Sequence, residues 1–288
     1  MTPPPISLAY SVDADDAFMF HALRTGAIDT DGLEFSHRRD HTAALNRIAI
    51  DEGADVVAVS LGVYPLIAHA YQILPHGASV GRGFGPVVVA SRPLAPADLA
   101  GLRVGIPGST TTAWLVLRLI APRAIGVEIP ISPYGRIFEA LDNGEVDAAL
   151  LIHEGRLLYP ARGLHRVVEL GEWWLAETGL PLPLGVNVIR RALGEPLIAR
   201  VSRVAHASIA WALAHRDEVI ADITAEDRGD KALSRPSLID EYLGLYANQD
   251  TFALADDTRR AVDALFARAR REGLIHFEQS VDWASAEA

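Results

Sequence analysis

A histidine stands directly after a short apolar run, at a position suited to proton transfer. Residues 148–152 are Ala-Ala-Leu-Leu-Ile, and His153 follows, with Glu154 and Arg156 close behind. An apolar run of this length is typical of a buried strand, and the carboxyl end of a parallel strand faces the ligand crevice of an α/β fold. The ordinary pKa of histidine, about 6.5, suits proton abstraction at neutral pH. His153 is thus a candidate general base; the alternative is a hydrogen-bonded histidine that merely ends the strand.

Two strand-to-helix turns carry hydroxyl groups that could hold an anion. The first is residues 108–112, Gly-Ser-Thr-Thr-Thr, and the second follows the strand end Ala58-Val59-Ser60. Free backbone N–H groups and the positive end of the helix dipole favour a carboxylate at such turns. We therefore predict a small-molecule carboxylate as the ligand. The alternative at both turns is ordinary helix capping, by Thr110 at the first and by Ser60 at the second.

Two further groups of residues invite a cofactor or metal interpretation. Residues 81–85 read Gly-Arg-Gly-Phe-Gly but precede a predicted strand, whereas a nucleotide-binding loop follows a strand and opens a helix. A flexible rim loop with Arg82 available for an anionic ligand is the better interpretation. Asp13, Asp15 and Asp16 could together hold a divalent metal. A helix N-terminus capped by Asp15 or Asp16 is favoured, so neither a metal nor an organic cofactor is predicted.

The composition excludes several classes of function. The chain has 288 residues and a net charge of −11, which argues against nucleic acid as its main partner. The only lysine, Lys231, lies in a polar segment, so a buried Schiff-base lysine is not expected, and the absence of cysteine excludes thiol chemistry. We find no signal-peptide pattern after Met1 and no apolar run near the roughly 18–20 residues of a membrane span. If Met1 is the native start, we expect a cytoplasmic protein outside the membrane.

These candidate residues must be positioned by an alternation of short apolar runs and amphipathic segments, which predicts sheets flanked by helices. We predict strands at residues 6–11, 33–38, 55–60, 85–91, 103–107, 127–132, 147–153 and 186–190. Helices are expected from Asp15 or Asp16 and at 42–52, 61–70, 110–120, 134–143, 198–215, 217–225, 237–248 and 256–272. Residues 173–174 and 180–185 are expected to be non-helical, because two prolines interrupt the stretch.

Two successive α/β units followed by a helical tail predict a two-lobed clamshell. We expect lobe 1 to comprise residues 1–91 with 186–288 and lobe 2 to comprise 92–185, with crossings near Ser91 and near 183–186. Ligands of such folds lie between the lobes. The alternative is one doubly wound domain with a helical appendage.

Several segments follow one another in an order that is informative. They are Asp16-Ala17-Phe18-Met19-Phe20, Leu45-Asn46-Arg47, Val59-Ser60, Gly81 to Pro86, Pro107-Gly108, Thr111-Thr112-Ala113, Ile152-His153-Glu154, Tyr159-Pro160 and Gly179 to Gly185. In this order they resemble the motifs of 1,4-dihydroxy-6-naphthoate synthase, the cyclic dehypoxanthinyl futalosine lyase of the futalosine route to menaquinone. The resemblance covers the chain from about Ile6 to the last helices, and it implies a cytoplasmic enzyme with a periplasmic-binding-protein-like (type II) fold.

The resemblance also implies roles for individual residues. His153 corresponds to the general base, and Ser60, Thr111 and Thr112 match positions that hold the substrate. Asn46 and Asp16 match polar residues that line the cleft, and no metal or organic cofactor is implied. The chain departs from the family at the turn after the first strand, where Pro-Asn-Asp is usual and Asp13-Ala14-Asp15-Asp16 stands here. It departs again at Ala58, where the family has a lysine. A non-catalytic organic-acid-binding protein and a chorismate-dehydratase-like paralogue are the alternatives.

Overall fold

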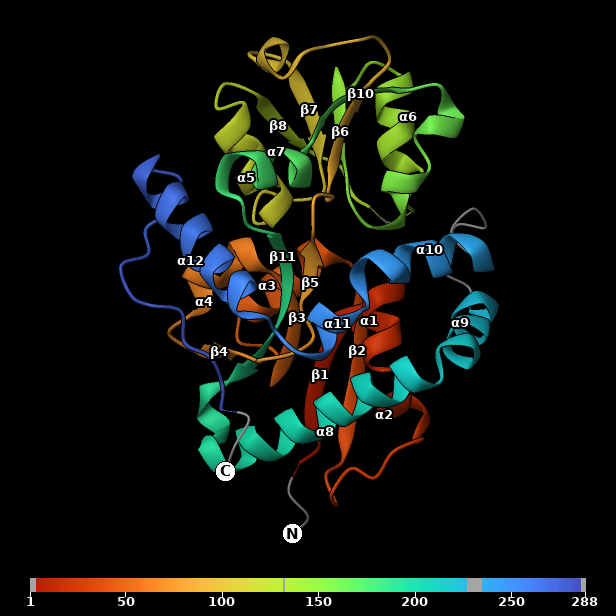
Figure 1. Cartoon of the computed structure of the whole chain (residues 1–288), viewed down its shortest axis with the longest axis vertical. Coiled ribbons are helices and arrows are strands. Elements are labelled where there is room, and N and C mark those ends of the chain that lie inside the picture. Colours follow the sequence, from red (N-terminus) through yellow and green to blue (C-terminus); the bar gives the residue numbers. More distant parts are fainter. Residues whose placement is uncertain (1–3, 132, 227–234, 286–288) are drawn as a thin grey trace.

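The chain folds into two lobes, each built on its own β-sheet and stacked along the long axis of the molecule (Figure 1). The computed structural model describes residues 4–131, 133–226 and 235–285. Lys231 with most of its polar segment, and Ser132 at the end of a predicted strand, lie outside the described residues. The two-lobed α/β architecture with a helical C-terminal part is confirmed.

Lobe 1, the lower one in Figure 1, contains a sheet in the order β2-β1-β3-β11-β4, with β5 pairing with β11. β1 runs parallel to β2 and β3, whereas β11 is antiparallel to β3. Because parallel strands end at one edge, Ser11 and Ser60, which close β1 and β3, lie at the same edge of this sheet. The strands are β1 (Ile6–Ser11), β2 (Phe35–Asp40), β3 (Val56–Ser60), β4 (Tyr71–Ile73), β5 (Ser79–Gly81) and β11 (Leu182–Arg190).

Lobe 2 contains a sheet in the order β10-β6-β9-β7-β8. β7 is parallel to β8 and β9, and β6 is antiparallel to β9 and β10. The carboxyl ends of β7 and β9 therefore bring the start of α5 and His153 to one edge. The elements are β6 (Val87–Ala90), β7 (Arg103–Ile106), α5 (Thr112–Ile120), β8 (Ile125–Glu128), α6 (Arg136–Asp142), β9 (Ala148–Leu151), β10 (His165–Glu169) and α7 (Leu170–Thr178).

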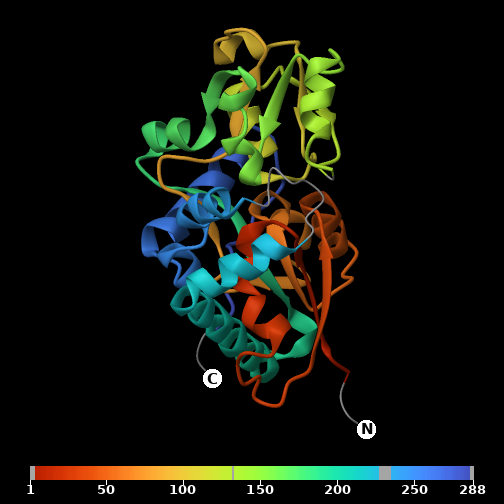
Figure 2. The same ribbon diagram turned by 90° about the vertical axis from the view of Figure 1, so that its right-hand side faces the viewer.

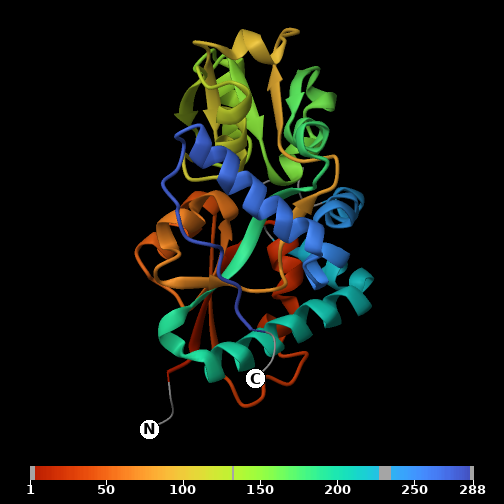
Figure 3. The same cartoon turned by 60° about the vertical axis from the view of Figure 1, so that its left-hand side comes forward.

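The helices of the C-terminal part pack mainly on lobe 1 (Figure 2). The last of them also reaches lobe 2: in Figure 3 it lies along the junction of the lobes, and its Arg268 donates to Glu177 over 2.9 Å. No helix among the described residues is long and apolar enough to span a membrane. The helices of this lobe are α1 (Ala14–Met19), α2 (His21–Thr25), α3 (Thr42–Ile50), α4 (Tyr64–Ile67), α8 (Glu195–Ala214), α9 (Arg216–Ala225), α10 (Pro236–Tyr246), α11 (Gln249–Phe252) and α12 (Asp256–Arg271).

The chain passes between the lobes at two neighbouring places. β5 belongs to the first sheet and β6 to the second, so the first crossing lies between Gly81 and Val87. The second precedes Leu182, whose partner in the sheet is Gly81. The structure thus corrects the expected boundaries near 91 and 186, which placed β6 in lobe 1 and the start of β11 in lobe 2. An apolar run shows that a strand exists, but not which sheet its backbone joins.

Three predictions of local structure are wrong. Trp173 and Trp174 lie within α7, because the prolines come after Gly179, which ends this helix with a φ of 69°. The expected helix at 61–70 is a 3₁₀ turn (Leu61–Val63) followed by the short α4, and the chain then enters β4. Asp13 is the N-cap of α1, so Asp15 and Asp16 lie in its first turn and do not cap it.

Candidate active site

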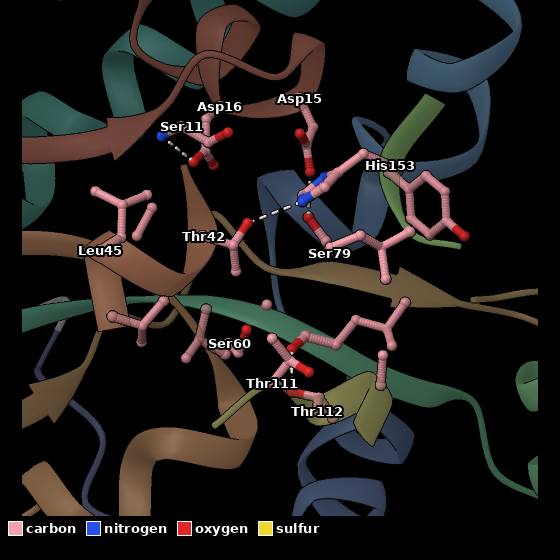
Figure 4. Close-up of a pocket in the computed structure, with 18 of the residues that line it drawn as sticks. Ser11, Asp15, Asp16, Thr42, Leu45, Ser60, Ser79, Thr111, Thr112 and His153 are labelled. Carbon is pink, nitrogen blue, oxygen red and sulfur yellow. Dashed lines mark hydrogen bonds between the residues drawn. The ribbon is translucent and has the colours of Figure 1, made fainter. Parts of the chain in front are cut away.

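A cavity of about 730 Å³, which includes space open to solvent, lies between the lobes. Both lobes and α10 contribute to its walls. Figure 4 shows Asp15, Asp16 and His153 on one side of it and Ser60, Thr111 and Thr112 on the opposite side. The lining residues are Ser11, Asp15, Asp16, Thr42, Leu45, Ala58, Val59, Ser60, Gly77, Ser79, Pro86, Thr111, Thr112, Ala113, Ile152, His153, Arg156, Leu184, Gly185, Val186, Asn187, Tyr242 and Tyr246.

His153 reaches from lobe 2 to contact lobe 1 and α10. Its Nε2 lies 2.9 Å from Thr42 Oγ1 and 3.3 Å from Asp13 Oδ2, and its Nδ1 lies 3.4 Å from Tyr242 Oη. The strand β9 ends at Leu151, and His153 follows with a φ of 48°, in the left-handed region that few non-glycine residues adopt. The side chain that was predicted to face the crevice does so, held by groups from three separate segments.

The backbone around His153 is fixed by a close contact with Tyr134. The Tyr134 hydroxyl donates to the carbonyl of Ile152, and a Cβ on Gly155 would overlap the Tyr134 ring. A glycine two residues after the histidine is therefore required for this packing. The backbone of residues 152–155 is thus held in one conformation, and it fixes the position of the imidazole.

The turn after β1 forms a buried acidic cluster beside this imidazole. Ser11 N donates to Asp16 Oδ2 over 2.7 Å, the Ser11 hydroxyl donates to Asp13, and Ser79 Oγ donates to Asp15 Oδ2 over 2.8 Å. Burial, reinforced by the charge of Asp15, raises the pKa of the Asp16 carboxyl to about 8. Burial also raises the pKa of Asp15. Near neutral pH this cluster therefore holds protons that isolated aspartates would have lost.

The same cluster controls the charge of His153. Burial lowers the pKa of His153, but nearby carboxylates, first Asp13 and then Asp15, raise it by more, so its net pKa lies above the ordinary value. Such a combination of desolvation and specific charge partners in a cavity is typical of residues that transfer protons.

Across the cavity, Thr111 and Thr112 use their hydroxyls for structural bonds. Thr111 is the N-cap of α5, since its Oγ1 accepts from Trp114 N over 3.2 Å; the predicted cap, Thr110, is not. Thr112 Oγ1 donates to Leu184 O over 2.6 Å and accepts from Gly62 N over 2.9 Å, and so joins α5 to lobe 1. The amides of Thr112 and Ala113 at the first turn of α5 have no acceptor within the helix, so this end of α5 is suited to an anion.

Ser60, Ala58 and Val59 line the cavity at the end of β3. Asn46 does not line it. Asn46 is completely buried beneath the cavity, where its Oδ1 accepts from Ser60 N over 3.0 Å and its Nδ2 donates to Thr110 Oγ1 over 3.0 Å. It therefore positions two ligand-facing turns, one from each lobe.

Arg82 is not available to a ligand in the way we predicted. Its guanidinium donates to both oxygens of Asp250 over 2.7 Å and to Asp257 over 2.7 and 3.0 Å, and it does not line the cavity. The glycine-rich loop is the first crossing between the lobes, and Arg82 fastens it to α11 and α12. An arginine in such a loop is compatible with anion binding. Its carboxylate partners, Asp250 and Asp257, lie 168 and 175 positions further along the chain, so no local pattern reveals them.

Several side chains of the cavity were not predicted from the sequence. Thr42 and Tyr242 lie 111 and 89 positions from His153 in the sequence, so no local pattern could join them. Asn187 did carry a signal, because a polar residue interrupts the apolar run of β11. Arg156 carried another, since it follows His153 by three positions; its Nε donates to Gly85 O over 2.6 Å and its Nη2 to Glu169 over 3.2 Å. Among the described lining residues, Arg156 supplies the permanent positive charge.

Comparison with protein families identifies the group to which this arrangement belongs. Residues 6–271 match the family model described as menaquinone biosynthesis. The chain belongs to the menaquinone biosynthesis family. The resemblance inferred from the motifs is confirmed at this level.

Two relatives place the chain more closely within the menaquinone biosynthesis family. The 1,4-dihydroxy-6-naphthoate synthase of Thermus thermophilus is 38% identical over 269 residues, which cover 93% of this chain and 95% of that protein. The enzyme of the same name from Streptomyces coelicolor is 36% identical over 287 residues, covering 96% of each chain. Membership of the family and these relatives support an enzyme of menaquinone biosynthesis.

Solved structures agree with the architecture. A crystal structure of a protein from Archaeoglobus fulgidus superposes with a TM-score of 0.87 at 38% identity, over 94% of this chain and 98% of that one. The alkanesulfonate-binding protein of Xanthomonas axonopodis pv. citri superposes with a TM-score of 0.71 at 13% identity, over 98% and 97%. The second likeness shows the fold alone. The periplasmic-binding-protein-like fold is confirmed.

Proposed function

We propose that this protein is a cofactor-free lyase that converts cyclic dehypoxanthinyl futalosine to 1,4-dihydroxy-6-naphthoate, with His153 as general base. The observation that carries the proposal is the setting of His153, in a chain of the menaquinone biosynthesis family. Lobe 2 presents the imidazole to the cavity, and Thr42, Asp13 and Tyr242 from the other side hold it. A base oriented by fixed partners in a cavity between lobes is suited to remove a substrate proton.

In this scheme the imidazole takes a proton from the substrate. The electron pair left behind opens the substrate ring, and the sugar-derived carbons leave as the naphthoate ring becomes aromatic. The imidazolium formed in this step is stabilised by nearby negative charge, first that of the Asp13 carboxylate, which also raises the pKa of His153. Tyr242 holds Nδ1 and so fixes the orientation of the ring.

The substrate carboxylate belongs on the opposite side of the cavity. Ser60, Thr112 and Ala113 line that side at the start of α5, and the positive end of the α5 dipole favours an anion there. The aspartates after β1 would repel the substrate carboxylate if it lay beside His153. These two facts support one orientation, with the carboxylate toward α5 and the reacting carbons toward His153.

Closure of the lobes supports the same chemistry. Ala14 N donates to Glu154 Oε1 over 3.1 Å, and Gly62 N donates to Thr112 over 2.9 Å, so direct hydrogen bonds join the lobes around the cavity. A closed cavity excludes water and aligns the reacting groups.

The test is turnover of cyclic dehypoxanthinyl futalosine by the purified protein, with 1,4-dihydroxy-6-naphthoate measured by liquid chromatography. The proposal predicts product from the wild type and at least about a hundredfold less from His153→Ala, the usual range for a general base. Substrate that binds without forming product would indicate the non-catalytic organic-acid-binding alternative. Absence of both binding and turnover would indicate a paralogue of the chorismate-dehydratase kind.

A further inference from the structure

Two buried oxygen atoms of the cavity wall have no hydrogen-bond partner among the described residues. They are Oδ1 of Asp15, on α1, and Oδ1 of Asn187, on β11. Their side chains are 6% and 2% exposed, and both residues line the cavity between the lobes. A buried polar atom without a partner costs about 1–3 kcal/mol, so native structures pair nearly all of them. Two in one cavity indicate a ligand that supplies donors.

The position of Asn187 is set by its surroundings. A Cβ on Gly77 would overlap Nδ2 of Asn187, and Gly77 has a φ of 77°, which favours glycine at that position. The backbone of Asn187 accepts from Leu74 N over 2.8 Å and pairs with Ala58 of β3. The amide therefore projects from the middle of the lobe 1 sheet, with its nitrogen packed against a glycine.

Asp15 is held in a comparable way. Its Oδ2 accepts from Ser79 Oγ over 2.8 Å, which leaves Oδ1 as the atom without a partner. Ser79, Asp15 and Asn187 all line the cavity. Asp15 and Asp16 lie side by side on this face of the cavity, so a neutral group that donates hydrogen bonds suits the place better than an anion does.

We propose that Asp15 and Asn187 form a hydroxyl-binding subsite, which receives the polyhydroxylated part of an organic acid. Hydroxyl groups donate and accept hydrogen bonds and carry no charge, so they match an amide and an acidic side chain together. The inference deepens the proposed function and rests on it for the identity of the natural ligand, whose sugar-derived carbons would occupy this subsite. The carboxylate of the same ligand would face α5.

The experiment compares two carboxylate probes by isothermal titration calorimetry on the full chain. Quinate is a cyclic carboxylate that carries several hydroxyls, and benzoate is a cyclic carboxylate that carries none. We expect the wild type to bind quinate at least about tenfold more tightly than benzoate, since each satisfied buried acceptor contributes on the order of a tenfold difference. Asn187→Leu should reduce that ratio at least about tenfold, with little change in the affinity for benzoate.

Two other variants keep the result interpretable. Asp15→Leu removes a buried carboxyl that already resists ionisation, so it is expected to fold and to lower the ratio in the same direction if Asn187→Leu fails to fold. Gln72→Leu is the matched control: Gln72 is a buried amide on β4, which also pairs with β11, but it does not line the cavity. The ratio of quinate affinity to benzoate affinity should be the same in Gln72→Leu as in the wild type.

The outcomes separate this inference from the proposed lyase activity. A wild type that does not prefer quinate, including one with no measurable quinate binding, overturns the subsite. So does a ratio that Asn187→Leu and Asp15→Leu leave unchanged. Neither measurement depends on turnover, so a subsite confirmed in a protein that does not convert cyclic dehypoxanthinyl futalosine would refute the lyase proposal alone.

Discussion

Replacing His153 by asparagine separates the chemistry of the imidazole from its structural role. His153 has a φ of 48°, and asparagine is among the residues that tolerate the left-handed region, so the backbone of this segment should persist. The amide cannot act as a base near neutral pH. We therefore expect folding and ligand binding to be largely retained while the proton-transfer step is lost.

The magnitude follows from the contacts of the imidazole. A positioned general base contributes roughly 10²–10⁴-fold, so kcat should fall at least about a hundredfold, equivalent to about 2.7 kcal/mol in the barrier. The contacts to Thr42 at 2.9 Å and Tyr242 at 3.4 Å are two hydrogen bonds with net values of about 0.5–1.5 kcal/mol each. Loss of these two hydrogen bonds weakens the contact between the lobes, and we expect it to raise KM by no more than about tenfold.

The matched control is Thr42→Val, which removes the hydrogen bond to Nε2 and leaves the imidazole in place. We expect this variant to change KM and to lower kcat by less than about tenfold. Single-turnover kinetics would show whether the chemical step itself is slowed. If His153→Asn keeps more than about a tenth of the wild-type kcat, or if Thr42→Val is equally impaired, His153 is a closure contact and not the base.

The remaining predictions concern ionisation and stability. The acidic limb of the pH profile of kcat/KM should lie above pH 6.5, because neighbouring carboxylates raise the pKa of His153. Asp13→Asn should move this limb to lower pH. A limb that Asp13→Asn leaves in place, measured between pH 5 and 9, would contradict the assignment of the limb to His153. Asn46→Leu leaves the buried Ser60 N–H without its acceptor, so calorimetry should show a Tm lower by about 3–10 °C, and an unchanged Tm would refute that role. Burial lowers the pKa of His76 to about 3, so the folded state takes up that proton less readily than the unfolded chain and stability falls as pH drops below about 6.5. Between pH 6.5 and 5 the loss should reach about 2 kcal/mol in urea unfolding, and His76→Phe should remove most of it.

The sequence predicted the elements of the fold well and their assignment to lobes less well. Each segment that was predicted to be a strand contains a strand, with ends displaced by a few residues. A strand can be predicted in this way because its run of apolar residues lies within one short stretch of the sequence. β4 and β5 were missed because three-residue strands, Tyr71–Ile73 and Ser79–Gly81, leave too few residues for an alternation to show. β10 was also missed, because its sequence His-Arg-Val-Val-Glu has only two apolar residues. The sheet order depends on pairings between distant segments, and a single sequence carries little information about them.

The candidate site shows the same division. His153 was found because it ends an apolar run, and Ser60, Thr111 and Thr112 were found because hydroxyls gather at turns. The residues that orient the imidazole come from α3, the turn after β1, and α10, and the fold alone brings them together. The prediction for Arg82 was wrong for a related reason. A cation in a glycine-rich loop could bind an anionic ligand, but in the folded protein its guanidinium is already paired with Asp250 and Asp257.

The charge of the cavity also has to be judged from the fold. Three aspartates after β1 and an alanine at position 58 in place of a lysine describe, as sequence, a surface that repels organic acids. Burial changes this conclusion, because it raises the pKa of Asp16 to about 8 and raises that of Asp15 as well, so near neutral pH part of the negative charge is absent. Arg156 also lines the cavity from lobe 2, but its guanidinium already donates to the carbonyl of Gly85 and to Glu169. We therefore expect an organic acid to bind with its carboxylate toward the start of α5, opposite a cluster whose negative charge is reduced by burial.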